Sequence, residues 1–141
     1  MIQRIQSIWL LLAAAFAFLT YTMVLYIGTL ADGTKKTFAL GDHFLLVACI
    51  IALGALSLIC IFLFKNRKAQ LRLTILTMVL TIGYIFLQYL MIERFKTENA
   101  IQSGSYQVAA LLPVVMIILL IFAARGIHKD QKLVKSLDRL R

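Results

Sequence analysis

Residues that could do chemistry are few in this sequence, and they lie mostly beside long apolar segments. An ionisable group inside a membrane is the usual mark of an ion or proton pathway, yet the apolar segments carry none. The two histidines, His43 and His128, are expected on opposite sides of a membrane, so they cannot ligate one haem. No serine, cysteine or aspartate has a base at a recognisable spacing for nucleophilic catalysis. We therefore predict no catalytic residue, no cofactor and no enzyme activity.

The sequence also gives little support for a metal site or a disulfide bond. Asp32, Asp42, Glu93 and Glu98 could gather on one side of the membrane, but their spacing matches no metal site, and we interpret them as solvated loop charges. Cys49 and Cys60 lie in one apolar segment, about 16 Å apart along a helix. That separation is too long for a disulfide. We read both cysteines as small hydrophobic side chains and predict no metal.

One intramembrane pattern is polar. Five residues recur at alternating steps of three and four, which keeps them within roughly 80° of a helix surface. We call them the polar stripe: Thr74, Thr77, Thr81, Tyr84 and Gln88. Such side chains can form an internal seam, where hydrogen bonds between membrane helices contribute about 0.6–2 kcal/mol each. They could also line a groove for a lipid, a quinone or a partner helix; we favour the internal seam and leave the groove open.

The C-terminal stretch RGIHKDQKLVKSLDRLR, residues 125–141, is strongly basic. Wound as a helix, it separates a leucine and valine face from a lysine and arginine face, which predicts an amphipathic cytoplasmic tail over 127–141. It could lie on anionic lipid, where each Lys or Arg contributes about 1 kcal/mol, or dock on a protein. It has no aromatic side chain for base stacking, so we predict no sequence-specific nucleic-acid partner. The predicted contact residues, including those of the second basic segment, are Arg67, Lys68, Arg72, Lys129, Lys132, Leu133, Lys135, Leu137 and Arg139.

The elements that carry these residues follow from composition. The 141-residue chain is 62% hydrophobic and 15% charged, with a net charge of +9, against roughly 45–50% and about 25% in soluble domains. Four segments lack charge and are long enough to cross a bilayer, which takes about 17–25 residues. We predict an all-α membrane protein: one domain over 1–141, an antiparallel four-helix transmembrane bundle with helices near 6–27, 43–64, 70–93 and 105–126. The first apolar run exceeds the 7–15 residues typical of a signal peptide, so we expect it to be retained.

Charge sets the expected orientation. Eleven Lys and Arg residues flank one side of the predicted helices and four flank the other. The positive-inside rule then places both termini in the cytoplasm. We expect a multi-pass membrane protein.

The connections carry local signals. Asp32-Gly33 predicts a turn between two short strands, and so a β-hairpin on the outer side. Asp42 is predicted to cap the second helix, and Ser103-Gly104-Ser105 to form a turn and the cap of the last one. Pro113 is predicted to bend that helix in its second or third turn.

Both ends of the chain also carry a resemblance. MIQRIQSIWLLLAA and RGIHKDQKLVKSLDRLR resemble the small inner-membrane proteins of Bacteroidota that are known only as a domain of unknown function. The resemblance covers the whole chain and implies a four-pass membrane protein of that phylum. It implies no activity, cofactor or catalytic residue.

Together these features predict a non-catalytic accessory or scaffolding subunit of a larger membrane complex. Its expected partners are membrane lipids and a protein, and no small-molecule substrate is predicted. The alternative is a small carrier, channel or lipid-handling protein that is lined by the polar stripe.

Overall fold

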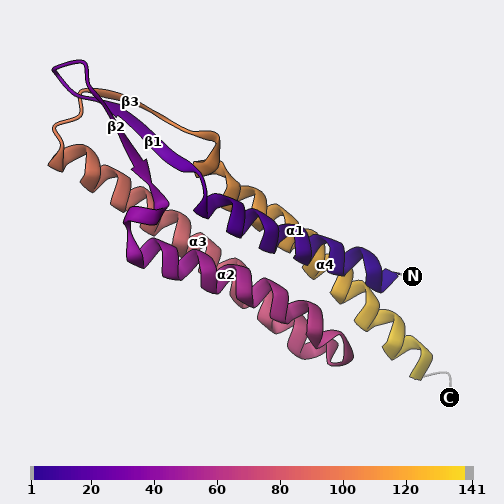
Figure 1. Ribbon diagram of the computed structural model, residues 1–141. Helices are drawn as coiled ribbons and strands as arrows, with labels where there is room; N and C mark the ends of the chain where they lie inside the picture. Colours follow the sequence, from indigo (N-terminus) through magenta and orange to yellow (C-terminus); the bar gives the residue numbers. More distant parts are fainter. Residues whose placement is uncertain (1, 139–141) are drawn as a thin grey trace.

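Four long helices lie side by side, and a small sheet covers one end of them (Figure 1). The computed structural model describes the backbone of residues 2–138 and the side chains of residues 5–134. Helices α1 and α3 each pack against both α2 and α4. The elements, in chain order, are α1 (Ile2–Tyr21), β1 (Val24–Thr29), β2 (Lys35–Ala39), α2 (Phe44–Phe62), α3 (Arg67–Glu98), β3 (Ser103–Tyr106) and α4 (Leu112–Asp138). Short 3-10 helices occupy Leu40–Asp42, Leu63–Lys65 and Val108–Leu111.

The first helix ends earlier than predicted. Instead of continuing to residue 27, α1 stops at Tyr21, where Thr22 donates its backbone N–H and its hydroxyl to the Leu19 carbonyl. The next residues, VLYIGT, form β1. A continuous apolar run does not distinguish helix from strand by periodicity. Pairing on both edges, with the neighbouring hairpin strand β2 and with the distant β3, decides the matter for β1.

The sheet contains the predicted hairpin and one strand that was not predicted. β1 and β2 pair antiparallel around Asp32-Gly33, and Gly33 takes a φ of +76° that favours glycine in such a turn. β3 adds to the other edge of β1, which gives the order β2-β1-β3. The residues of β3 were predicted as a turn and a helix cap; they pair with β1 from Tyr26 to Thr29 instead.

Two predictions about helix starts were wrong. Asp42 does not cap α2, because it lies in the preceding 3-10 helix. The N-cap residue of α2 is His43, whose side chain forms no capping hydrogen bond. Pro113 does not bend the last helix, because α4 begins at Leu112 and its proline therefore sits in the first turn. A proline costs nothing there, since the N–H that it lacks would have no helical partner. α4 then continues without a break through the basic stretch to Asp138.

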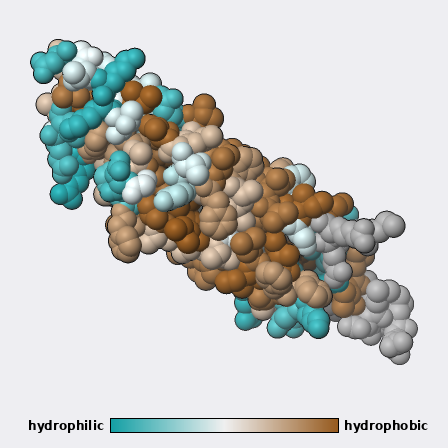
Figure 2. All heavy atoms as spheres, viewed as in Figure 1, coloured by the Kyte–Doolittle hydropathy of each residue, from teal (hydrophilic) through white to brown (hydrophobic). Residues whose placement is uncertain are grey.

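The surface divides into an apolar middle and two polar ends. Figure 2 shows a hydrophobic belt between hydrophilic ends, and many belt side chains are exposed, with Phe44 at 86%, Phe62 at 76% and Phe86 at 64%. Three helices are long and apolar enough to cross a membrane: α2 with its 3-10 extension, α3, and α4. The described apolar part of α1, Ile5–Tyr21, is shorter. The protein thus has the features of a membrane protein, with three such helices among the described residues rather than the four predicted.

The buried interior forms two clusters. One lies beneath the sheet and includes Leu25, Phe38, Tyr84 and Met116. The other includes Leu10, Cys60 and Leu120. Both cysteines are unpaired, as expected from their spacing.

Candidate functional site

The end of the molecule opposite the sheet collects most of the positive charge. The start of α1, the turn between α2 and α3, and the C-terminal part of α4 all lie there (Figure 1). We call it the basic end, and its described basic side chains are Lys65, Arg67, Lys68, Arg72, Arg125, Lys129 and Lys132. The four other described basic residues, Lys35, Lys36, Arg94 and Lys96, are on β2 and on the last turns of α3, at the sheet end.

A buried carboxylate ties three helices together at the basic end. Asp130 of α4 is 4% exposed. Its Oδ2 accepts a hydrogen bond of 2.8 Å from Gln6 Nε2 of α1 and lies 3.7 Å from Arg67 Nη1 of α3. The same Arg67 nitrogen donates to the Asp130 carbonyl at 3.3 Å, and Gln131 Nε2 donates to the Arg67 carbonyl at 2.7 Å. We call this set the Asp130 cluster.

This geometry changes the expected role of Arg67. A carboxylate leaves water only when a charge and hydrogen bonds replace its hydration, and Arg67 supplies the charge. The Arg67 side chain is 28% exposed, so the guanidinium that was expected to contact a partner or lipid faces the protein interior. The sequence did not single out Asp130. The signal for it was that it is one of only two acids, with Asp138, in a strongly basic stretch.

The other predicted contacts at the basic end are exposed where the structure describes them. Lys68 and Arg72 are exposed on α3, as are Lys129, Lys132 and Leu133 on α4. Val134, beside Leu133, is 43% exposed. The side chains of Lys135, Leu137 and Arg139 lie outside the described residues. The exposed part therefore presents cations together with aliphatic side chains.

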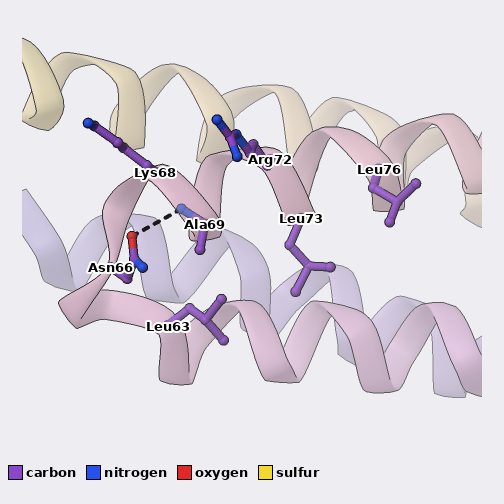
Figure 3. Close-up of a pocket in the computed structure, with 7 residues that line it drawn as sticks. All are labelled: Leu63, Asn66, Lys68, Ala69, Arg72, Leu73 and Leu76. Carbon is purple, nitrogen blue, oxygen red and sulfur yellow. Dashed lines mark hydrogen bonds between the residues drawn. The ribbon is translucent and has the colours of Figure 1, made fainter.

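A groove of about 520 Å³ lies along the start of α3 at this end, beside the 3-10 helix Leu63–Lys65. Leu63, Leu73 and Leu76 line it with Lys68 and Arg72. Figure 3 shows the two cations extending from α3 on the side opposite Leu63 and Leu73. Asn66 caps α3 there by accepting a hydrogen bond of 3.3 Å from the Ala69 N–H. The groove thus combines an aliphatic wall with a cationic edge.

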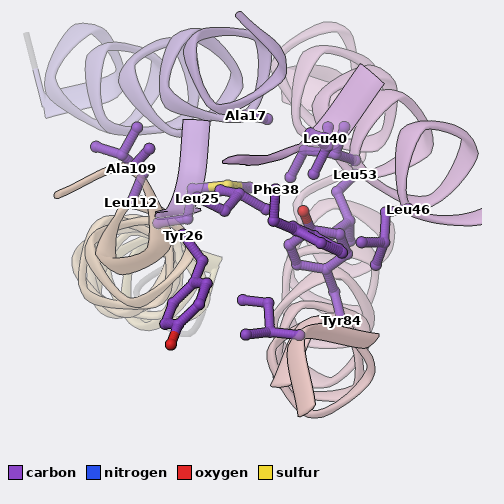
Figure 4. Close-up of a cluster of buried hydrophobic side chains, with 13 residues drawn as sticks. Ala17, Leu25, Tyr26, Phe38, Leu40, Leu46, Leu53, Tyr84, Ala109 and Leu112 are labelled. Atoms are coloured by element: carbon purple, nitrogen blue, oxygen red, sulfur yellow. The ribbon is translucent and has the colours of Figure 1, made fainter. Parts of the chain in front are cut away.

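All five residues of the polar stripe are buried on one face of α3. The three threonine hydroxyls donate to carbonyls of their own helix: Thr74 to Gln70, Thr77 to Leu73 and Thr81 to Thr77. Gln88 Nε2 donates to the Ala110 carbonyl at 3.3 Å. Tyr84 lies among the core side chains beneath the sheet (Figure 4), and its Oη and the Gln88 Oε1 have no hydrogen-bond partner. Most of the stripe's polar atoms are thus already engaged inside the protein.

Two acids at the sheet end, Glu93 and Glu98, pair with neighbouring bases. Arg94 Nε lies 2.7 Å from Glu98 Oε1, and Lys96 donates to Glu93 and to the Tyr106 hydroxyl at 3.1 Å. The Lys96 ammonium also lies 5.0 Å and 4.9 Å from the ring centres of Tyr26 and Tyr106. Among the described residues, no group of three or more His, Cys, Asp or Glu side chains is placed to hold a metal ion.

Comparison with known proteins gives one result. The sequence pattern of a family described as Domain of unknown function (DUF4293) matches residues 2–140. This match confirms the resemblance to a family of unknown function. No curated protein and no solved structure matches the chain.

Proposed function

We propose that this chain, a member of the family described as Domain of unknown function (DUF4293), is a non-catalytic accessory or scaffolding subunit of a larger membrane complex. Its basic face contacts a protein partner or anionic lipid. In this proposal the chain spans the inner membrane of a bacterium of the phylum Bacteroidota as a four-helix transmembrane bundle, and both termini lie in the cytoplasm.

Helix length supports four crossings. α1 has 20 residues, which at 1.5 Å per residue span about 30 Å, the thickness of the hydrocarbon core. It lies alongside α2 and α4, both of which are long and apolar enough to cross. The excess of Lys and Arg at the end shared by α1, α4 and the α2–α3 turn supports a cytoplasmic position for that end.

The observation that carries the proposal is the C-terminal part of α4. The Asp130 cluster fixes α4 to α1 and α3, and the helix continues to Asp138. Beyond the cluster it exposes Val134 and Lys132. We call residues 132–138 the α4 extension. A helix that presents aliphatic side chains among cations is suited to docking in a groove on another protein.

The α4 extension is tested by purification from native membranes in a mild detergent. We expect a partner in fixed stoichiometry with the wild-type chain. We expect at least a tenfold lower yield of that partner with Leu133→Glu/Val134→Glu, because burying two carboxylates at an interface costs several kcal/mol.

Thr37→Glu, an exposed change at the sheet end, is the matched control and is expected to keep the partner. Recovery of the chain alone, both with and without the two substitutions, would refute the scaffolding role.

The alternative function, a carrier, channel or lipid-handling protein, is supported by one groove. It measures about 450 Å³ between α2 and α3 and is lined by aliphatic side chains together with Cys49, Gly83 and Tyr84. Tyr84 belongs to the polar stripe, but the stripe's threonine hydroxyls are bonded within their own helix. We therefore favour the scaffolding role.

A further inference from the structure

A separate groove of about 440 Å³ runs between α3 and α4 at the basic end. Its floor is apolar and consists of Leu71, Ile75 and Ala124. Its rim is basic and belongs entirely to α4: Arg125, His128, Lys129 and Lys132. At about 100° per residue these four positions fall within roughly 100° of the helix surface, so three full positive charges and a histidine share one face.

No described side chain of α4 neutralises the charge of this rim. Asp130 is the one acid of that helix whose side chain the structure describes, and it is only 6% exposed. It is held by Gln6 and Arg67, and it lies about 140° around the helix from Arg125. Its carboxylate therefore serves the Asp130 cluster, and the rim keeps its net positive charge.

The groove lies where the apolar belt ends. On α3, the uncharged segment starts at Leu73, between the floor residues Leu71 and Ile75. On α4, the uncharged segment ends at Ala124, and the rim begins at the next residue. The floor thus faces the depth of acyl chains, while the rim faces the depth of lipid headgroups.

We infer that this groove is a binding site for an anionic phospholipid, with an acyl chain along Leu71, Ile75 and Ala124 and the headgroup phosphate on Arg125 and Lys129. Basic pockets between membrane helices on the cytoplasmic side suit such headgroups. The inference deepens the lipid contact proposed above and rests on the membrane placement given there. It does not depend on the protein partner.

An apolar floor separates this site from a simple anion site. A soluble phosphate would use the rim alone, whereas a phospholipid uses rim and floor together. A zwitterionic lipid would fill the floor but gain little from the rim. These differences define the probes of the experiment.

The test is a lipid titration of the purified full-length chain in detergent micelles, followed by native mass spectrometry. The probes are phosphatidylglycerol, phosphatidylethanolamine and soluble glycerol phosphate. We expect phosphatidylglycerol to bind at least tenfold more tightly than phosphatidylethanolamine, and glycerol phosphate not to displace it.

The charge variant is Arg125→Gln/Lys129→Gln. Each near-surface cation contributes about 1 kcal/mol, about fivefold in affinity, so we expect phosphatidylglycerol to bind roughly 25-fold more weakly. Lys35→Gln/Lys36→Gln is the matched control. It removes the same charge from two exposed lysines of β2 at the sheet end, away from the groove, and should change the affinity less than threefold.

A shape variant keeps the test decisive if the charge variant does not fold. Ala124→Phe fills the floor and leaves the net charge unchanged, and it should weaken phosphatidylglycerol binding at least fivefold. Equal losses in the charge variant and its control, no loss with Ala124→Phe, or displacement by glycerol phosphate would each overturn the lipid site. None of these outcomes bears on recovery of a protein partner through the α4 extension.

Discussion

Asp130 illustrates how one residue can fix the arrangement of several helices. Among the described side chains it is the one charged group that is buried, and it is contacted from α1 by Gln6 and from α3 by Arg67. A misplaced helix would leave this carboxylate without partners in a poorly hydrated place, which is costly. The cluster therefore selects one register of α1 and α3 against α4.

Asp130→Asn should lower the free energy of unfolding by about 1–3 kcal/mol. The amide keeps the size of the side chain but leaves Arg67 without its counter-charge, and breaking a buried pair costs about 3–5 kcal/mol. We reduce that value because Arg67 is partly exposed, at 28%. Denaturant unfolding in detergent, followed by circular dichroism, measures the change.

Glu98→Gln is the matched comparison for this prediction. It breaks the Arg94–Glu98 pair at the sheet end, whose side chains are 74% and 59% exposed. A solvent-exposed pair contributes about 0–1 kcal/mol. Equal losses of stability in the two variants would contradict the special role of Asp130.

At the scale of elements, the sheet joins segments that are remote in sequence. Gly28 of β1 lies opposite Gly104 of β3, and the Tyr26 ring passes over Gly104 to meet the Tyr106 ring edge-on at 5.1 Å. Lys96 of α3 lies over both rings. β1, β3 and the end of α3 thus form one packed unit at the sheet end.

Gly104→Ala should loosen β3 from β1. A Cβ at this position would overlap Tyr26 Oη and would come within 2.7 Å of the Ile27 carbonyl oxygen. Such overpacking costs about 1–3 kcal/mol. Hydrogen exchange of the Gln107 amide, which donates to the Leu25 carbonyl, should accelerate at least fivefold.

Gly41→Ala serves as the control, since a Cβ there meets no atom within 4 Å. Its exchange rates should match those of the wild-type protein. Unchanged protection of Gln107 in the Gly104 variant would show that β3 tolerates the added methyl group.

At the scale of the whole molecule, the helices differ in how far they extend beyond the apolar belt. α3 has 32 residues, or about 48 Å, so its charged last turns continue past a hydrocarbon core of about 30 Å and reach the sheet. α4 extends in the other direction, through the basic end to Asp138. The two ends are therefore chemically distinct, with the sheet at one and exposed cations at the other.

Single cysteines at the two ends test the proposed orientation. In right-side-out spheroplasts, a membrane-impermeant maleimide should label Lys36→Cys but label Lys132→Cys only after lysis. Lys36 and Lys132 are both exposed, and the wild-type chain, with Cys60 buried and Cys49 half-buried in α2, gives the background. The reverse labelling order would place the basic end outside.

Much of the architecture follows from the sequence by local physics. The absence of charge over lengths that span a bilayer predicted the membrane class, and Asp32-Gly33 predicted the hairpin because its geometry needs only neighbouring residues. The steps of three and four in the polar stripe placed five residues on one helix face, and that face is buried.

Tertiary structure decided what depends on partners far along the chain. The segment VLYIGT is a strand because the distant β3 pairs with it as well as the neighbouring β2, and its own residues suit a membrane helix equally well. Arg67 faces inward because Asp130, 63 residues later, accepts its hydrogen bond on the backbone carbonyl and pairs with it through the carboxylate. Gln6 donates to that carboxylate across 124 residues. Local periodicity carries no information about such pairs. Only the packed helices bring them within hydrogen-bond distance, where burial makes each pairing necessary.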